Sequence, residues 1–275
     1  MSPSFQPRTR PFRLALIGVI VALCATSASA ETDLKELARK AKSSVVKLDV
    51  LDRFGNPLGS GSGFFVTQDG WIVTNHHVVA GADQVVANLA DGTQLPIEGV
   101  LASQADDDLA VLRAPQTQAA ALPLARSSLD LEIGEEIVVL GGPLGLAGTL
   151  SDGIIAAVRQ EGDQALTQGS TFASSRLQIT AAISPGSSGS PVMNLDGEVI
   201  GVVVSQVTVG QNLNFAVPVE SLRQLLAGID PQAEPRRLRS IRSADGGSGS
   251  VVRNLVISVV FFALLALGYL RWGRS

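Results

Sequence analysis

The chain contains two histidines, His76 and His77, which are adjacent in the run Thr-Asn-His-His-Val-Val. Imidazole changes its charge near neutral pH, so a histidine is the side chain best suited to transfer protons at physiological pH. Metal binding would need further ligands, but the chain has no third histidine and only one cysteine, Cys24. We therefore expect no metal site and take one histidine of the pair as a candidate general base.

A candidate nucleophile is Ser188, within the glycine- and serine-rich run at residues 183–191. A serine in such a turn is on its own most often a loop residue. The glycines nevertheless allow a tight turn in which backbone N–H groups near Gly186 and Ser188 converge on one point as an oxyanion hole. Ser187 and Ser190 are rivals by composition, but we choose Ser188, which lies within the Gly186–Gly189 turn and directly precedes Gly189.

Three consecutive acids, Asp106, Asp107 and Asp108, precede the apolar run at residues 109–112. We expect Asp106 and Asp107 to lie in a solvated loop. Asp108 directly adjoins the predicted strand, where a carboxylate can be partly buried and can orient an imidazole. Asp108 is therefore the candidate acid.

The order of these residues along the chain excludes other serine hydrolases. In an α/β-hydrolase the histidine follows the nucleophile and the acid, but no histidine follows His77. The turn of such an enzyme also has glycine two residues after the nucleophile, where this chain has Ser190. All lysines lie within residues 35–47, far from the candidate serine, so a serine–lysine pair is excluded too. The remaining order of histidine, aspartate and serine is that of chymotrypsin-like enzymes.

Short apolar runs separated by turns dominate residues 44–218 and predict an all-β fold, either a sandwich or barrels. Asp-Gly pairs at 69–70, 91–92 and 196–197 favour tight hairpins, because both residue types tolerate positive φ. One short helix is predicted at Glu31–Lys42 and a closing helix at Val219–Leu226. The predicted strands are Val45–Val50, Gly63–Thr67, Trp71–Thr74, Val85–Leu89, Leu109–Leu112, Glu136–Leu140, Leu177–Thr180 and Val199–Ser205.

Seven short motifs resemble, in the same order, those of the HtrA (Deg) group of trypsin-like serine proteases, over roughly residues 34–228. The resemblance implies a chymotrypsin-like fold of two six-stranded antiparallel β-barrels with the site between them. His77 and Asp108 would come from the first barrel and Ser188 from the second. The motifs are Gly61–Phe64, Trp71–Val79, Asp108–Val111, Gly142–Gly145, Ile183–Pro191, Asp196–Gly201 and Asn214–Pro218.

The resemblance also assigns roles to single residues. His77 takes the position of the catalytic histidine, and His76 takes the preceding position, where Asn is common in the family. Asp108 takes the position of the acid and Ser188 that of the nucleophile. We accordingly expect substitution of His76 to be nearly silent.

The surroundings of the nucleophile follow from the same resemblance. The backbone amides of Gly186, Ser187 and Ser188 are assigned to the oxyanion hole. The family's usual Gly-Asn-Ser-Gly-Gly is replaced by Gly-Ser-Ser-Gly-Ser, which adds a side chain at Ser190 that we expect to be tolerated. Ala182, six residues before the nucleophile, would lie at the base of the specificity pocket and favour small or medium aliphatic side chains.

These roles predict a serine endopeptidase that hydrolyses peptide bonds of exported or misfolded proteins through an acyl-enzyme, with no cofactor. Two alternatives remain open: a catalytically inactive, protease-like adaptor that binds peptides at the membrane, and a hydrolase that acts on esters alone. The presence of all three candidate residues favours the protease. The oligomeric state stays open.

The ends of the chain predict export and a membrane anchor. Residues 1–30 are typical of a cleavable signal peptide, with three arginines, an apolar stretch of ten residues and a small-residue site before Glu31. The protease domain is expected at 31–229 and an Arg/Gly/Ser-rich linker at 230–250, with no PDZ domain. A transmembrane helix at 251–271 and a short cytoplasmic tail at 272–275 would hold the protease domain on the periplasmic or extracellular side. A sorting tail that is cut after export is an alternative for the same C-terminal residues.

The distribution of charge argues against nucleic-acid binding. The formal net charge of −4 combines a core at 31–229, with 22 acids against 11 Lys and Arg, and two basic ends. An acidic domain repels phosphate backbones, whereas basic ends beside apolar stretches are typical of membrane-related segments.

Overall fold

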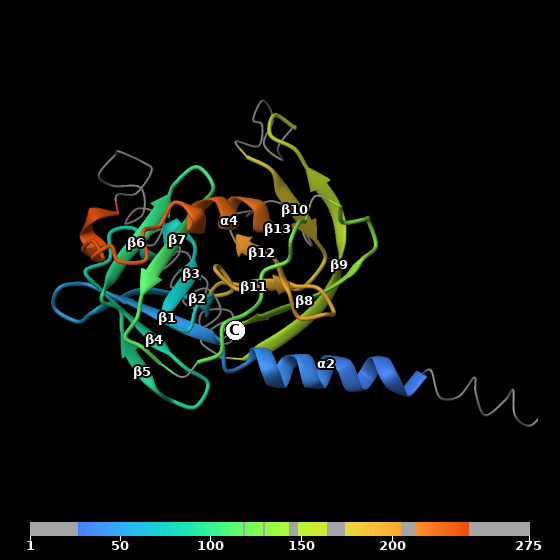
Figure 1. The fold of residues 1–275 in the computed structure, drawn as a ribbon, viewed down its shortest axis with the longest axis horizontal. Helices are drawn as coiled ribbons and strands as arrows, with labels where there is room; N and C mark the ends of the chain where they lie inside the picture. Colours follow the sequence, from blue (N-terminus) through green and yellow to red (C-terminus); the bar gives the residue numbers. More distant parts are fainter. Residues whose placement is uncertain are drawn as a thin grey trace, which may run out of the picture.

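The computed structural model of the protein describes residues 27–117, 119–128, 130–142, 148–163, 174–204 and 213–241. Within these ranges, antiparallel strands form two units that lie side by side (Figure 1). The predicted all-β class is confirmed. The predicted transmembrane helix and most of the predicted signal peptide lie outside the described residues. Of the helices that are described, none combines the length and the apolar character needed to cross a bilayer.

The first unit is a seven-stranded sheet with the order β5-β4-β1-β2-β3-β7-β6. The expected closed six-stranded barrel is therefore wrong for this unit. β5 ends at Pro96, Ile97 N still donates to Val85 O of β4 at 2.9 Å, and Glu98 N donates to Arg113 O of β7 at 2.8 Å, so the chain passes from β5 into β6 through residues 97–98. The strands are β1 (Val45–Leu51), β2 (Pro57–Phe65), β3 (Trp71–Thr74), β4 (Gln84–Asn88), β5 (Gln94–Pro96), β6 (Gly99–Gln104) and β7 (Leu109–Arg113).

The second unit is a closed six-stranded barrel, as predicted, with the order β10-β13-β12-β11-β8-β9. Its strand β12 is buried along its whole length, which explains its continuous apolar sequence. The strands are β8 (Glu136–Gly141), β9 (Thr149–Arg159), β10 (Arg176–Ile179), β11 (Pro191–Met193), β12 (Val199–Val204) and β13 (Asn214–Pro218).

The three predicted Asp-Gly hairpins are present. Gly70, Gly92 and Gly197 have φ of 84°, 89° and 82°, in the turns between β2 and β3, β4 and β5, and β11 and β12. These angles are accessible to glycine without a steric penalty, which is why the pattern was informative.

A hydrophobic cluster joins the two units. Phe64 and Leu109 from the first unit and Leu140, Val202 and Val217 from the second belong to it, and all five are at most 1% exposed. Burial of such side chains is the main favourable term in folding, so this cluster fixes how the two units meet.

Among the described residues, three α-helices and one 3₁₀ turn accompany the two sheet units. α2 (Ser27–Ala41) begins four residues before the predicted helix, and α4 (Val219–Ala227) agrees with its prediction. α4 contacts β12 and β13 of the barrel as well as β6 and β7 of the sheet, and Figure 1 shows it lying across both units. A short helix, α3 (His76–Val79), follows β3, and a 3₁₀ turn, η2 (Leu238–Ser240), lies near the end of the described chain.

The segment after Gly228 departs from the expected linker. It returns from α4 to the first unit, where Leu238 and Ile241 are 6% and 5% exposed within the core of the sheet. A linker was predicted because the segment has no regular spacing of apolar residues. Two apolar side chains, Leu238 and Ile241, are nevertheless enough to pack it against the sheet.

Candidate active site

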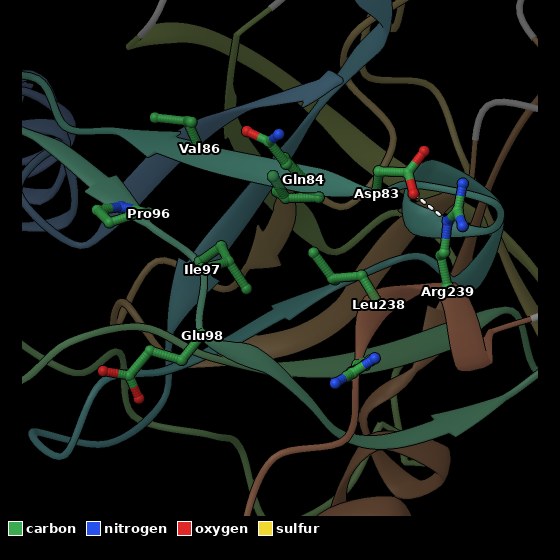
Figure 2. Close-up of a pocket in the computed structure, with 10 residues that line it drawn as sticks. Asp83, Gln84, Val86, Pro96, Ile97, Glu98, Leu238 and Arg239 are labelled. Atoms are coloured by element: carbon green, nitrogen blue, oxygen red, sulfur yellow. Dashed lines mark ion pairs between the residues drawn. The ribbon is translucent and has the colours of Figure 1, made fainter. Parts of the chain in front are cut away.

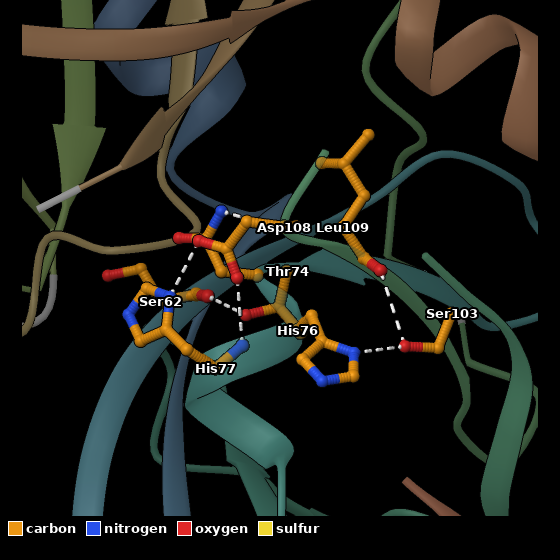
Figure 3. Close-up of polar contacts among 8 residues, drawn as sticks. Ser62, Thr74, His76, His77, Ser103, Asp108 and Leu109 are labelled. Carbon is orange, nitrogen blue, oxygen red and sulfur yellow. Dashed lines mark hydrogen bonds and ion pairs between the residues drawn. The ribbon is translucent and has the colours of Figure 1, made fainter. Parts of the chain in front are cut away.

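His77 lies on α3, which starts directly after β3. Its backbone N–H donates to Asp108 Oδ1 at 2.9 Å, and its Nδ1 lies 2.7 Å from Asp108 Oδ2 (Figure 3). The side chain of His77 is 32% exposed and that of Asp108 is 10% exposed. A carboxylate on Nδ1 favours the tautomer that leaves Nε2 free to accept a proton, so the pair is arranged as a general base with its orienting acid.

Asp108 has a strained backbone that is held in place by several contacts. Its φ is 60°, and it is the one residue other than glycine with positive φ in the described part of the chain. Its N–H donates to Ala105 O at 3.1 Å, while its carbonyl accepts from His76 N at 3.1 Å and Asn75 Nδ2 at 3.0 Å. Such a conformation costs on the order of 1–3 kcal/mol and is typical of functional sites.

His76 points away from His77 and has a separate partner. Its Nδ1 lies 2.7 Å from Ser103 Oγ on β6, and the residue is 8% exposed (Figure 3). Because β6 and β7 flank the turn that carries Asp108, this contact connects α3 to that turn. The expectation that His76 is dispensable does not agree with this burial.

Two consecutive turns lie between β10 and β11, and Ser188 is the second residue of the second turn. Ser187 N donates to Ser184 O at 2.9 Å around Gly186, and Ser190 N donates to Ser187 O at 3.0 Å around Gly189. The two glycines have φ of 97° and 87°, as the third position of a type II turn requires. Ser188 itself is 6% exposed.

Of the three backbone N–H groups assigned to the oxyanion hole, one already donates a hydrogen bond within the Ser188 loop. Because Ser187 N donates to Ser184 O, the structure removes Ser187 from the predicted oxyanion donors. Gly186 N and Ser188 N have no acceptor among the described residues. Two donors separated by one residue are the arrangement that a developing oxyanion needs.

Ser62, on β2 of the first unit, holds this loop and was not singled out from the sequence. Its N–H donates to Ser188 O at 2.8 Å, and its Oγ donates to Gly186 O at 2.7 Å and accepts from Gly142 N at 3.1 Å. The only sequence signal was its position between two glycines, Gly61 and Gly63, in a strand. Small neighbours allow a close approach of the second unit.

Gly61 shows how near the two parts of the site lie. A Cβ on Gly61 would lie 2.7 Å from Val78 Cγ1 on α3 and 3.3 Å from Ser188 O. The helix of His77 and the turn of Ser188 therefore both lie within contact distance of the point where a side chain at position 61 would begin. The described hydrogen bonds include none between the His77 and Ser188 side chains.

Ala182, the predicted pocket residue, is exposed, and its carbonyl accepts from Ser151 Oγ at 2.9 Å. The preceding Ala181 is buried, and its carbonyl accepts from Asn214 Nδ2 at 2.7 Å. Bonds to β9 and β13 thus fix the backbone on which a substrate side chain would rest.

The half-buried Arg176 interacts with the carboxylates of the acidic turn. Burial lowers the pKa of the Arg176 guanidinium, while the carboxylates of Asp107 and Asp108 act in the opposite direction. Asp107 is 8% exposed, so the expectation of a solvated loop residue is wrong for it. The described residues contain no group of three or more His, Cys, Asp or Glu that could hold a metal.

Comparison with known proteins gives one consistent family. The family described as "Trypsin-like peptidase domain" matches residues 61–202, just over half of the chain. "Serine protease HTR4" of Rattus norvegicus is 39% identical over 172 residues, which are 62% of this chain and 34% of that protein. "Serine protease HTRA2, mitochondrial" of Bos taurus is 38% identical over 200 residues, 70% of this chain and 42% of that protein.

Solved structures similar to this chain are also named as proteases. The Rv3671c protease from M. tuberculosis in its active form has a TM-score of 0.63 at 26% identity, covering 74% of this chain and 87% of that one. The HtrA-type protease AlgW with tripeptide has a TM-score of 0.60 at 28% identity, and the match covers 70% of this chain and 61% of that one. The chain spans about a third to two fifths of the length of the curated relatives that it matches. On the family match, these relatives and the geometry above, the chain belongs to the trypsin-like peptidase domain family, as an HtrA-like member.

Proposed function

We propose that the protein is a serine endopeptidase in which Ser188 is the nucleophile, His77 the general base and Asp108 the orienting acid. The observation that carries this proposal is the 2.7 Å contact between His77 Nδ1 and Asp108 Oδ2, made by an aspartate in a strained backbone conformation. Backbone strain of this kind clusters at functional sites, which supports the proposed role of Asp108.

The chemistry is acyl transfer to water. Ser188 Oγ attacks the peptide carbonyl as its proton passes to His77 Nε2, and Asp108 stabilises the imidazolium that forms. The N–H groups of Gly186 and Ser188 donate to the carbonyl oxygen as it becomes negative. His77 then gives the proton to the leaving amine, and water hydrolyses the acyl-enzyme by the same route in reverse. No cofactor takes part.

The substrates proposed are exported or misfolded proteins, cleaved after small or medium aliphatic residues. Ala182 offers neither a carboxylate for a basic side chain nor bulk that would exclude an aliphatic one. Because such a pocket discriminates by only about 1–3 kcal/mol per methylene, the preference should be broad. Profiling with a peptide library tests this assignment, and dominant cleavage after Lys or Arg would contradict it.

The location proposed is outside the cytoplasmic membrane, with a cleaved signal peptide at 1–30 and an anchor at 251–271. Two relatives support export, since they are named "Probable periplasmic serine endoprotease DegP-like", from Halomonas elongata and Hahella chejuensis. The anchor rests on the apolar C-terminal stretch alone.

A labelled fluorophosphonate tests the activity directly, because it reacts with an activated serine. We expect the purified chain to be labelled and to cleave peptides, and Ser188→Ala to lose both properties with an unchanged circular dichroism spectrum. Ser187→Ala serves as the matched control and should be labelled normally. A chain that binds peptides without being labelled would instead be the inactive adaptor.

A further inference from the structure

Residues 235–241, here called the strap, attach the chain after α4 to the first unit. α4 contacts strands of both units, and the chain that follows it runs to β6, where Arg236 and Val100 exchange two backbone hydrogen bonds of 2.8 Å. Close packing supports this bridge, since a Cβ on Gly99 would lie 2.4 Å from Arg236 O. The start of the strap is therefore fixed to the sheet.

The end of the strap contacts the loop that follows the helix of His77. Gly81 N donates to Ile241 O at 3.3 Å, and Arg239 forms an ion pair with Asp83 (Figure 2). Both contacted residues lie within four positions of Val79, where α3 ends. The strap therefore holds the loop from which α3 projects.

Buried side chains connect the strap to α3 through the core. Leu238 and Ile241 belong to the same hydrophobic cluster as Val79 and Ala82, which are both fully buried. Movement of the strap would change the packing behind the helix that carries His77, because protein interiors are dense and transmit displacement.

The strap also borders open space on one side. A pocket of about 270 Å³ lies between it and the β4–β5 hairpin, lined by Val86, Pro96 and Glu98 on one side and Leu238 on the other (Figure 2). Arg236, Leu238 and Ile241 attach the strap to the first unit beside this pocket.

We infer that the strap is a positioning segment for His77. The inference rests on the proposed function, in which His77 must align with Ser188 on the other unit. A displacement of the strap would reach the 81–83 loop first and then α3. Small misplacements of a base reduce kcat without weakening substrate binding.

The test uses the ion pair of Arg239 and Asp83, whose side chains are 61% and 16% exposed, and Tm reports any effect of its loss on the fold. Asp83→Arg and Arg239→Asp each break the pair, and the double variant restores it with the charges exchanged. Arg237→Asp is the matched control: it makes the same charge change on the same strap, at an exposed side chain with no ion pair among the described residues. Ile241→Ala removes the buried end of the strap as a separate probe.

The readouts are kcat and KM for a peptide ester, the rate of fluorophosphonate labelling and Tm. We expect the single variants and Ile241→Ala to lower kcat and the labelling rate together, by up to about tenfold, with KM unchanged. The charge-exchanged double variant should recover, and Arg237→Asp should match the unmodified chain. Normal kcat and labelling in Asp83→Arg, Arg239→Asp and Ile241→Ala, whatever their Tm, would overturn the inference alone. No labelling of the unmodified chain would overturn the proposed function and the inference with it.

Discussion

At the scale of single residues, the two adjacent histidines have different environments. His77 faces Asp108 and is partly exposed, whereas His76 is buried against Ser103. Adjacent positions in a helix point in directions about 100° apart, so one can reach the cleft while the other enters the core. The same dipeptide therefore supplies the proposed base and a residue that holds the base in place.

The pair of His77 and Asp108 makes a direct prediction. Asp108→Asn keeps the shape of the side chain but presents an amide to Nδ1, which favours the wrong tautomer of the imidazole. We expect kcat to fall by about 10⁴, as in other enzymes with this triad. Stopped-flow or burst kinetics with an ester substrate would measure it, with Asp106→Asn as the control. A loss of less than tenfold would show that Asp108 is not the orienting acid.

His76 yields a prediction that the sequence alone did not support. His76→Ala should lower the free energy of unfolding by about 1–3 kcal/mol, because it opens a space and leaves Ser103 without this partner. It should also lower kcat, since α3 and the Asp108 turn lose a direct connection. His76→Asn, which retains hydrogen-bonding groups, should recover part of both. If His76→Ala were as active and as stable as the unmodified chain, the buried contact would have no role.

At the scale of elements, the nucleophile turn depends on close packing against β2. A Cβ on Gly189 would lie 2.1 Å from Ser62 O and 2.6 Å from Thr74 Oγ1, and its φ of 87° is unfavourable for any other residue. We expect Gly189→Ala to destabilise the protein by about 2–5 kcal/mol and to remove activity. Denaturant unfolding would measure the first effect. Gly162→Ala is a control for positive φ alone, because a Cβ there meets nothing within 4 Å.

The N-terminus of α4 makes a pH-dependent prediction. Burial would raise the pKa of Glu220, but hydrogen bonds from Ser128 and Ser127 outweigh it, so the pKa is lowered. The carboxylate accepts from Ser128 N at 2.6 Å, Ser128 Oγ at 2.5 Å and Ser127 Oγ at 2.9 Å. Because the folded-state pKa lies below the unfolded one, this stabilisation is present at neutral pH and is lost as the pH falls towards the folded-state pKa.

Glu220→Gln should therefore lower Tm at pH 7 and have little effect below the folded-state pKa. The loss at pH 7 should be on the order of 1 kcal/mol, since Glu220 is half-buried and solvent screens part of its charge. Thermal unfolding of both proteins across the acidic range would measure it, with Glu234→Gln as the control. A difference that stays constant with pH would contradict the ionised role of Glu220.

At the scale of the whole molecule, the proposed anchor predicts a topology. The folded domain should lie outside the cytoplasmic membrane, with residues 272–275 inside. Added protease should digest residues 31–229 in intact spheroplasts, and mass spectrometry of the mature protein should recover Ser275. Digestion only after lysis would contradict this topology, and a C-terminus cut before the apolar stretch would identify a sorting tail instead.

Much of this protein was determined by its sequence. The order of His77, Asp108 and Ser188, the Asp-Gly turns and the apolar runs predicted an all-β fold and a candidate site, because tight turns and strand alternation are local and leave a pattern in neighbouring residues. The β5, β6, β9, β11 and β13 strands were missed, since exposure, brevity, proline or polar residues weakened that pattern.

Only the tertiary structure shows which residues far apart in the sequence contact one another. Ser62 contacts a loop 124 positions away through Gly186 O, and Arg236 returns to Val100 across the whole second unit. Likewise, His76 Nδ1 is within hydrogen-bond distance of Ser103 Oγ, and the backbone N–H of Ser187 donates to Ser184 O within a turn. Such contacts depend on which surfaces pack together when apolar area is buried, and burial does not depend on separation along the chain. No local pattern therefore marks these partners, although they hold the proposed base and nucleophile in place.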